Sequence, residues 1–234
     1  MPLARQVADI NAQLMARLGY DRFGVQGGDW GGIISRWTAF NDADHGGGMH
    51  LNFVTSTAPP DPDNPNEGVS NAELARMRAR QQFMSTERGY SAIQGTKPQT
   101  LGYGLNDSPA GLAAWIVEKF RTWCDCGGDI ESIFTKDELL TNVMIYWVTG
   151  TITSSTRLYF ESRNATPSRP MGYIEVPTGA ALFPKEITLP PRRWAETRYN
   201  ITHWTEMPRG GHFAALEQPE LLVEDVRTFF QGLR

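Results

Sequence analysis

The sequence contains few cysteines and no long apolar run. These two features argue against a disulfide-rich secreted domain and against a membrane-spanning protein. Only two of its 234 residues are cysteines, too few for the disulfide framework of a small secreted domain. Its longest apolar stretches, such as residues 143–148, are far shorter than the roughly 20 residues that cross a bilayer. The first twenty residues hold no continuous apolar segment either, which argues against a signal peptide. We therefore expect a cytoplasmic protein with no transmembrane segment.

An excess of charge of one sign is also missing. The 22 basic and 26 acidic residues leave a net charge of −4 at pH 7, which gives no electrostatic reason to expect a nucleic acid or an anionic membrane as a partner. Cys124 and Cys126 have no nearby histidine to complete a metal site, so we expect reduced thiols and no metal. The length suits one large domain or two small ones. The oligomeric state stays open, a homo-oligomer included.

Strand and helix signals at the two ends of the chain indicate an α/β core. Apolar residues near the start recur at helical spacing and therefore fall on one face of a predicted helix: Leu3, Val7, Ile10, Leu14 and Leu18. A strand over 22–26, a glycine-rich turn and a helix over 33–41 follow, an order typical of a parallel sheet. A second strand is predicted over 49–54. Late in the chain the pattern resumes, with strands over 172–177 and 200–207 and helices over 191–196 and 219–230.

Helix signals dominate the middle of the chain. After a proline-rich stretch that starts at Ala58, capping residues open three predicted helices, at Ser70, Ser108 and Thr135. This order indicates a mostly parallel, hydrolase-like sheet with an inserted helical lid. We therefore expect three segments: a first core segment over 1–58, a helical cap over 59–165 and a second core segment over 166–234.

The sharpest motif is the turn Gly27-Gly28-Asp29-Trp30-Gly31. It has the G-x-nucleophile-x-G form of a nucleophile elbow and lies between a predicted strand and a predicted helix, as such an elbow must. Its glycines are expected because side chains there would collide with the neighbouring strand and helix. A carboxylate in the nucleophile position attacks carbon and forms an alkyl ester, which suits epoxides or haloalkanes. The alternative is a glycine-rich turn in which Asp29 is a helix N-cap.

His212 is the candidate base. It follows the last predicted strand and two glycines that permit a tight loop. An early elbow and a late histidine match the chain order of α/β-hydrolases, whereas a histidine taken alone is more often structural. The other three, His45, His50 and His203, lack such a context and are expected to be structural.

The third member of such a site is an acid that orients the histidine and stabilises its protonated form. Glu186 follows the strand predicted over 172–177 and is the best placed. Glu175 lies within that strand, and Glu196 and Glu206 have the surroundings of surface positions. Position along the chain therefore favours Glu186 over these alternatives.

From about residue 17 to its end, the chain resembles the microsomal-type epoxide hydrolases. The resemblance is carried by VQGGDWGG, GYSAIQGTKPQTLGYG, SSTRLYFE, VPTGAALFPKEI and MPRGGHFAALEQPELL. It implies an α/β-hydrolase core with a helical cap that hydrates epoxides to vicinal diols without a cofactor, in xenobiotic detoxification. By motif, Asp29 matches the nucleophile of this family, His212 its base and Glu186 its charge-relay acid. Tyr90 and Tyr159 fall in the stretches that hold its two cap tyrosines.

The resemblance implies a two-step reaction on a small apolar epoxide and water. Asp29 attacks an epoxide carbon while the two cap tyrosines hold the departing oxygen. His212, oriented by the acid, then activates the water that hydrolyses the ester. The backbone N–H of Trp30 stabilises the oxyanion of this second step. Five further aromatic residues either line an apolar pocket or pack the cap helices: Trp115, Phe120, Trp123, Tyr146 and Trp147.

The sequence departs from this family at its start. Only one predicted helix precedes Arg22, and the family's His-Gly-x-Pro motif, which carries a second oxyanion donor, does not occur. We expect the strand over 22–26 to form an exposed sheet edge. Loss of one oxyanion donor is expected to slow ester hydrolysis by about 10²–10³-fold and to affect alkylation less. The chain is then a fragment of a longer enzyme or an enzyme impaired at turnover.

Two other functions stay open. An inactive or impaired hydrolase fragment would act as a scaffold or need its missing N-terminal half. A haloalkane dehalogenase also uses an elbow aspartate, and Trp30 occupies the place of a halide-binding donor. The cap motifs and the paired tyrosines argue against the dehalogenase.

Overall fold

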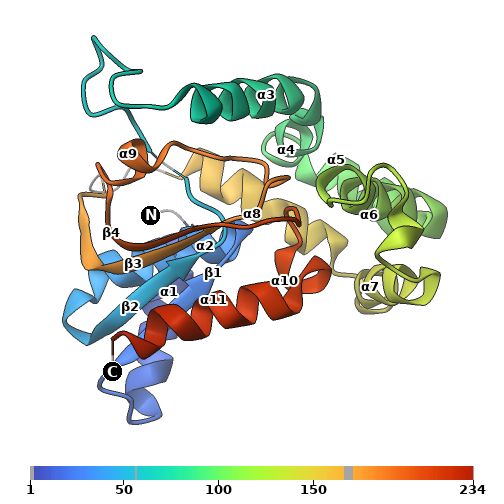
Figure 1. Cartoon of the computed structure of the whole chain (residues 1–234). Coiled ribbons are helices and arrows are strands. Elements are labelled where there is room, and N and C mark those ends of the chain that lie inside the picture. Colours follow the sequence, from blue (N-terminus) through green and yellow to red (C-terminus); the bar gives the residue numbers. More distant parts are fainter. Residues whose placement is uncertain (1–2, 56, 166–170, 234) are drawn as a thin grey trace.

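A four-stranded parallel sheet forms the centre of the computed structural model, which describes residues 3–55, 57–165 and 171–233. The strands follow one another across the sheet in chain order: β1 (Phe23–Gly27), β2 (Gly46–Leu51), β3 (Ile174–Leu182) and β4 (Tyr199–Glu206). The strand β1 therefore lies at one edge, with no described strand beyond it. Figure 1 shows this sheet with helices on both of its faces.

Different helices cover the two faces of the sheet, and alternate side chains of each strand pack against them. One face carries α2 (Asp29–Asn41), on which α1 (Leu3–Arg17) packs, and the other carries α11 (Pro219–Gln231). Side chains alternate along a strand, so Met49 and Leu51 join the core cluster that contains Ala39 of α2. His50 points the other way, and its ring centroid lies 5.8 Å from that of Phe229 on α11.

Glycines in the strands let α11 approach the sheet closely. Gly48 has φ of 136° and a Cβ there would lie 2.4 Å from Leu233; a Cβ on Gly179 would lie 2.9 Å from Phe229. The predicted strand over 49–54 is therefore shifted: β2 starts at Gly46, because its glycine-rich half pairs with β1 and makes room for α11.

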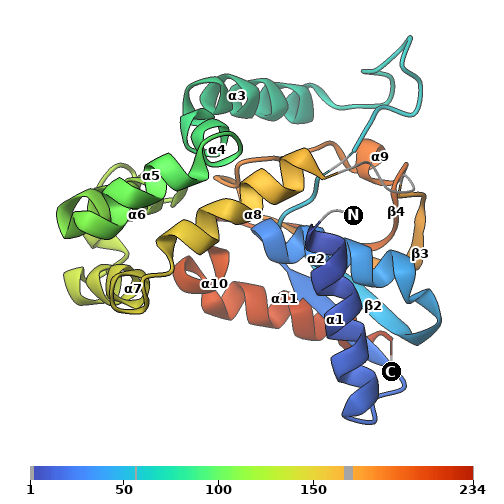
Figure 2. The ribbon, with the colours of Figure 1, turned by 180° about the vertical axis from the view of Figure 1, so that it is seen from behind.

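The described residues between β2 and β3 form six helices. These helices gather to one side of the sheet (Figures 1 and 2). They are α3 (Asn71–Glu87), α4 (Gly89–Gln94), α5 (Pro98–Asp107), α6 (Pro109–Trp123), α7 (Lys136–Thr149) and α8 (Ile152–Asn164). The three predicted helix starts are confirmed: Ser70 and Thr135 form capping boxes, and the Ser108 side chain accepts a hydrogen bond from the backbone N–H of Gly111. Short elements complete the chain: 3-10 turns over Ala43–His45 and Ile130–Ser132, α9 (Arg192–Ala195) and α10 (Ala214–Glu217).

The predicted first helix is present as α1, but much of its apolar face is exposed. Ile10, Leu14 and Leu18 are all more than half exposed, whereas Ala4 and Ala8 are buried. The helix α1 packs on α2, and its buried residues are these two alanines. None of the helices in the described ranges is both long and apolar enough to span a bilayer.

Candidate active site

Asp29 occupies a strained position at the junction of β1 and α2. Its φ is 44°, and it is the one non-glycine residue with positive φ in the described part of the chain. Such strain concentrates at functional sites. The N-cap of α2 is Gly28, without a side-chain hydrogen bond, so the alternative reading of Asp29 as the N-cap is not observed. The carboxylate is instead 47% exposed and faces His212.

The steric need for glycine holds for three positions of this turn. A Cβ on Gly27 would lie 2.3 Å from the carbonyl carbon of Gly31, and one on Gly28 would lie 2.5 Å from the amide nitrogen of Asn52. Gly32 approaches the carbonyl oxygen of Phe53, which would lie 3.2 Å from an added Cβ. At Gly31 a Cβ would meet nothing within 4 Å. The predicted collision is therefore wrong for the last glycine of the motif.

His212 lies between two carboxylates. Its Nδ1 is 2.6 Å from Oε1 of Glu186, and its Nε2 is 3.7 Å from Oδ2 of Asp29. Glu186 is fully enclosed, and the same Oε1 accepts a 2.6 Å hydrogen bond from the backbone N–H of Ile187. The structure thus brings together the three residues that the sequence singles out.

The surroundings of the other acids and histidines differ. Glu175, Glu196 and Glu206 are exposed, so none of them takes the place of Glu186. His50 and His203 each contact Asp225 of α11, at 2.9 and 2.8 Å.

The two carboxylates control the charge of His212. Burial alone lowers the pKa of the imidazole, but the nearby Asp29 carboxylate, the hydrogen bond to Glu186 and the negative charges of both groups raise it to about 10. The free site therefore holds an imidazolium paired on both sides.

Tyr90 on α4 and Tyr159 on α8 cover this site from the helical segment. Their ring centroids are 5.8 Å apart, and the ring of Tyr159 lies 5.1 Å from that of Trp30. Burial raises the pKa of both phenols, and the negative charge of Asp29 raises it further. Both tyrosines therefore keep their protons and can donate hydrogen bonds. The backbone N–H of Trp30, in the first turn of α2, is left without an acceptor in its own helix.

A cavity of about 390 Å³ opens in front of these groups. Four of the five predicted aromatic residues line it: Trp115, Phe120, Trp123 and Tyr146. The fifth, Trp147, packs in the cluster between the cap helices.

The wall of the cavity also holds two polar residues that the sequence reading missed. Gln94 is buried and follows Tyr90 by four residues on the same helix, so helical spacing was the available signal. The Lys119 ammonium lies 5.3 Å from the centre of the Tyr90 ring and 2.9 Å from Oε2 of Glu87. Burial opposes its charge, but hydrogen bonds to Glu118 and Glu87 give a net rise in its pKa.

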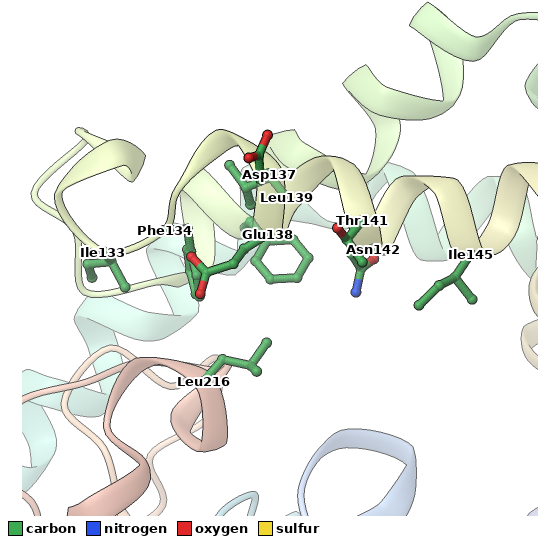
Figure 3. Close-up of a pocket in the computed structure, with 10 residues that line it drawn as sticks. Ile133, Phe134, Asp137, Glu138, Leu139, Thr141, Asn142, Ile145 and Leu216 are labelled. Atoms are coloured by element: carbon green, nitrogen blue, oxygen red, sulfur yellow. The ribbon is translucent and has the colours of Figure 1, made fainter.

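A second hollow of about 410 Å³ adjoins the first. It lies between α7 and α10, and Figure 3 shows Leu216 facing the side chains of α7 across the gap. Phe120, Asn142 and Leu216 line both hollows. The two hollows therefore share part of their walls.

Comparison with known proteins finds similarity to epoxide hydrolases. No family model matches the chain. It is 40% identical to epoxide hydrolase 1 of Sus scrofa over 95% of this chain and 54% of that protein. It is 42% identical to juvenile hormone epoxide hydrolase 2 of Ctenocephalides felis over 95% of this chain and 52% of that protein. The solved structure of juvenile hormone epoxide hydrolase from the silkworm Bombyx mori superposes with a TM-score of 0.88 at 34% identity, over 99% of this chain and 59% of that one.

These matches confirm the predicted resemblance to epoxide hydrolases and the predicted fold, a partial α/β-hydrolase core with a helical insertion. The chain spans about half the length of the curated relatives it matches.

Proposed function

We propose that this chain carries the catalytic site of an epoxide hydrolase, which converts apolar epoxides to vicinal diols through an ester on Asp29. The observation that carries this function is the row of Asp29, His212 and Glu186, with neighbouring groups 3.7 and 2.6 Å apart. The similarity to named epoxide hydrolases over 95% of the chain supports it.

In the first step a carboxylate oxygen of Asp29 attacks one epoxide carbon and the ring C–O bond breaks. The freed oxygen takes a proton from Tyr90 or Tyr159, whose raised pKa keeps them protonated until then. The products are a hydroxyalkyl ester and a tyrosinate. General-acid assistance of this kind contributes about 10²–10⁴-fold to rate.

Formation of the ester also changes His212. The negative charge of Asp29 disappears, so one of the two interactions that raise the His212 pKa is lost. The imidazolium then releases its proton, which restores the tyrosine. His212 becomes a neutral base at the moment when the second step needs one.

In the second step neutral His212 takes a proton from water, and the resulting hydroxide attacks the ester carbonyl of Asp29. The Trp30 N–H stabilises the oxyanion. Collapse breaks the ester C–O bond, and the leaving alkoxide takes the proton of the hydroxyl that was added. This step releases the diol and returns the Asp29 carboxylate, while the proton that His212 took from water stays on His212. Epoxide and water are consumed, one of each, and the site returns to its paired, protonated state.

The two hollows favour apolar epoxides with an extended substituent. Aromatic residues surround the reacting end, and the hollow between α7 and α10 shares Phe120, Asn142 and Leu216 with this cavity and would hold the substituent. A series of terminal epoxyalkanes of increasing length tests this. We expect Leu216→Trp to raise KM for the long members only; an equal effect on short and long members would contradict the extended site.

The assignment of residues 59–165 to a cap between core segments 1–58 and 166–234 is part of the same proposal, because α4 and α8 supply the two tyrosines. A cytoplasmic location is proposed with it.

The direct test of the function is diol formation from an aryl epoxide such as styrene oxide. We expect an Asp29-dependent reaction that is absent in Asp29→Asn. A folded chain that forms neither diol nor adduct would support an inert fragment instead.

A further inference from the structure

Two carboxylates outside the reaction tie the His212 loop to the helical segment. Oδ2 of Asp125 accepts a hydrogen bond from the backbone N–H of Gly210 at 3.0 Å. A second hydrogen bond has its donor in the helical segment: the backbone N–H of Asp125 donates to Oε2 of Glu217 at 2.7 Å. The second oxygen, Oε1 of Glu217, accepts from the N–H of Phe213 at 3.0 Å. We name these four residues the clasp.

The clasp surrounds His212 on both sides in the chain. The backbone N–H of His212 itself donates to the carbonyl of Trp123 at 3.0 Å, and the Trp123 ring lies edge-on to the imidazole with centroids 5.2 Å apart. Next to it, a Cβ on Gly211 would lie 2.4 Å from the same Trp123 carbonyl oxygen. The loop and the segment after α6 are therefore in close backbone contact.

Glu217 is the buried centre of this arrangement. It is 8% exposed, it has no part in the proposed reaction, and both of its oxygens accept backbone N–H groups on either side of the contact. A glutamine would present an NH2 group to one of those donors and leave two donors facing each other.

We propose that Glu217 is a positioning residue, which holds the His212 loop against the Trp123–Asp125 segment so that the imidazole stays within reach of Asp29 and Glu186. This inference rests on the proposed function. Loss of this positioning should affect the two steps differently. Alkylation uses Asp29 and the tyrosines, whereas ester hydrolysis needs the imidazole in place. A displacement of about 1 Å at a reacting group costs about 10²-fold in rate.

The test measures the two steps separately in Glu217→Gln. Rapid mixing with styrene oxide, followed by intact-protein mass spectrometry, gives the rate of adduct formation and the rate of its breakdown. We expect breakdown to slow by about tenfold to 10²-fold while adduct formation changes less than about twofold. The ester adduct then accumulates in the steady state. Glu217→Asp, which keeps both acceptor oxygens, should recover part of the loss.

The matched control is Glu220→Gln, the same change on an exposed residue three positions further along; both of its rates should equal those of the original protein. Asp125→Ala removes the acceptor of the Gly210 N–H instead. This variant replaces Glu217→Gln in the test if Glu217→Gln does not fold. Breakdown at the original rate in a folded clasp variant overturns the inference. So does an equal loss in both steps, since that is the result of a purely structural role.

A readout without turnover separates this inference from the proposed function. The proton shared by His212 Nδ1 and Glu186 gives a far-downfield proton NMR signal when the ring is fixed. We expect this signal to broaden or vanish in Glu217→Gln and to persist in Glu220→Gln. An unchanged signal overturns the positioning role even if the chain proves inactive on epoxides, and failure of the original chain to react with epoxides counts against the proposed function alone.

Discussion

The Nε2 atom of His212 lies 3.7 Å from Oδ2 of Asp29, on the side of the ring opposite its 2.6 Å hydrogen bond to Glu186. The two residues come from opposite ends of the chain. Their pairing makes the charge of the imidazole depend on the charge of Asp29, and this dependence links the two steps of the proposed reaction.

The first prediction concerns that link. Replacing Asp29 by asparagine removes one of the two carboxylates that raise the His212 pKa. We expect the pKa of His212 in Asp29→Asn to be lower than in the original protein, where it is about 10. An NMR titration of the imidazole measures both values. Equal pKa values in the two proteins would contradict the proposal that His212 releases its proton when the ester forms.

The second prediction concerns the phenols. Tyr90→Phe or Tyr159→Phe keeps the ring packing but removes a hydrogen-bond donor to the epoxide oxygen. We expect each change to slow adduct formation by roughly 10-fold to 10²-fold, because the remaining tyrosine retains part of the general-acid effect. Breakdown of the adduct, followed in the same mass spectra, should stay unchanged. A loss confined to breakdown would assign the tyrosines to the wrong step.

The third prediction separates two glycines of one motif. A Cβ on Gly27 would overlap the backbone of Gly31, whereas a Cβ on Gly31 is free of contacts within 4 Å. Gly27→Ala should destabilise the fold by about 1–3 kcal/mol. Gly31→Ala, inside α2, should be neutral or stabilise by up to about 1 kcal/mol through helix propensity. Urea unfolding of the two variants checks this, and equal losses of stability would contradict it.

The fourth prediction concerns acid stability and the face of the sheet opposite α2. Burial raises the pKa of Asp225, but hydrogen bonds from His50, Thr205 and His203 outweigh it and lower the pKa to about 2. A depressed folded-state pKa contributes stability above the unfolded value of about 4. That contribution is lost as pH falls towards 2. Asp225→Asn should therefore be less stable than the original protein at pH 7, and the difference should shrink between pH 4 and pH 2. A difference independent of pH would show that Asp225 acts without its charge.

The nucleophile elbow could be predicted from sequence because its constraint is local. A few consecutive residues contain the whole motif, with Gly27 and Asp29 between a strand and a helix. The positive φ of Asp29 is the strained conformation expected at such an elbow. Glu186 was found by its place after a strand. Its position favoured it over the other acids, and the structure places it 2.6 Å from His212.

The features that could not be predicted from the sequence depend on contacts between residues that are far apart in the chain. Asp125 and Glu217 are 92 positions apart, and no local pattern joins them. The exposed face of α1 shows the same limit. Its leucines and its alanines both recur at helical spacing, and only packing against α2 decides that Ala4 and Ala8 are buried.

Whether Asp29 becomes covalently modified is the central question, and one peptide answers it. Trypsin cleavage after Arg22 and Arg36 releases residues 23–36, in which Asp29 is the one acidic side chain. The protein is incubated with excess styrene oxide in oxygen-18 water, digested in ordinary water and examined by mass spectrometry, with Asp29→Asn as the control. We predict that peptide 23–36 carries either one epoxide adduct or oxygen-18 from ester hydrolysis, and that the control carries neither. Diol formed while this peptide stays unmodified and unlabelled would contradict the ester mechanism.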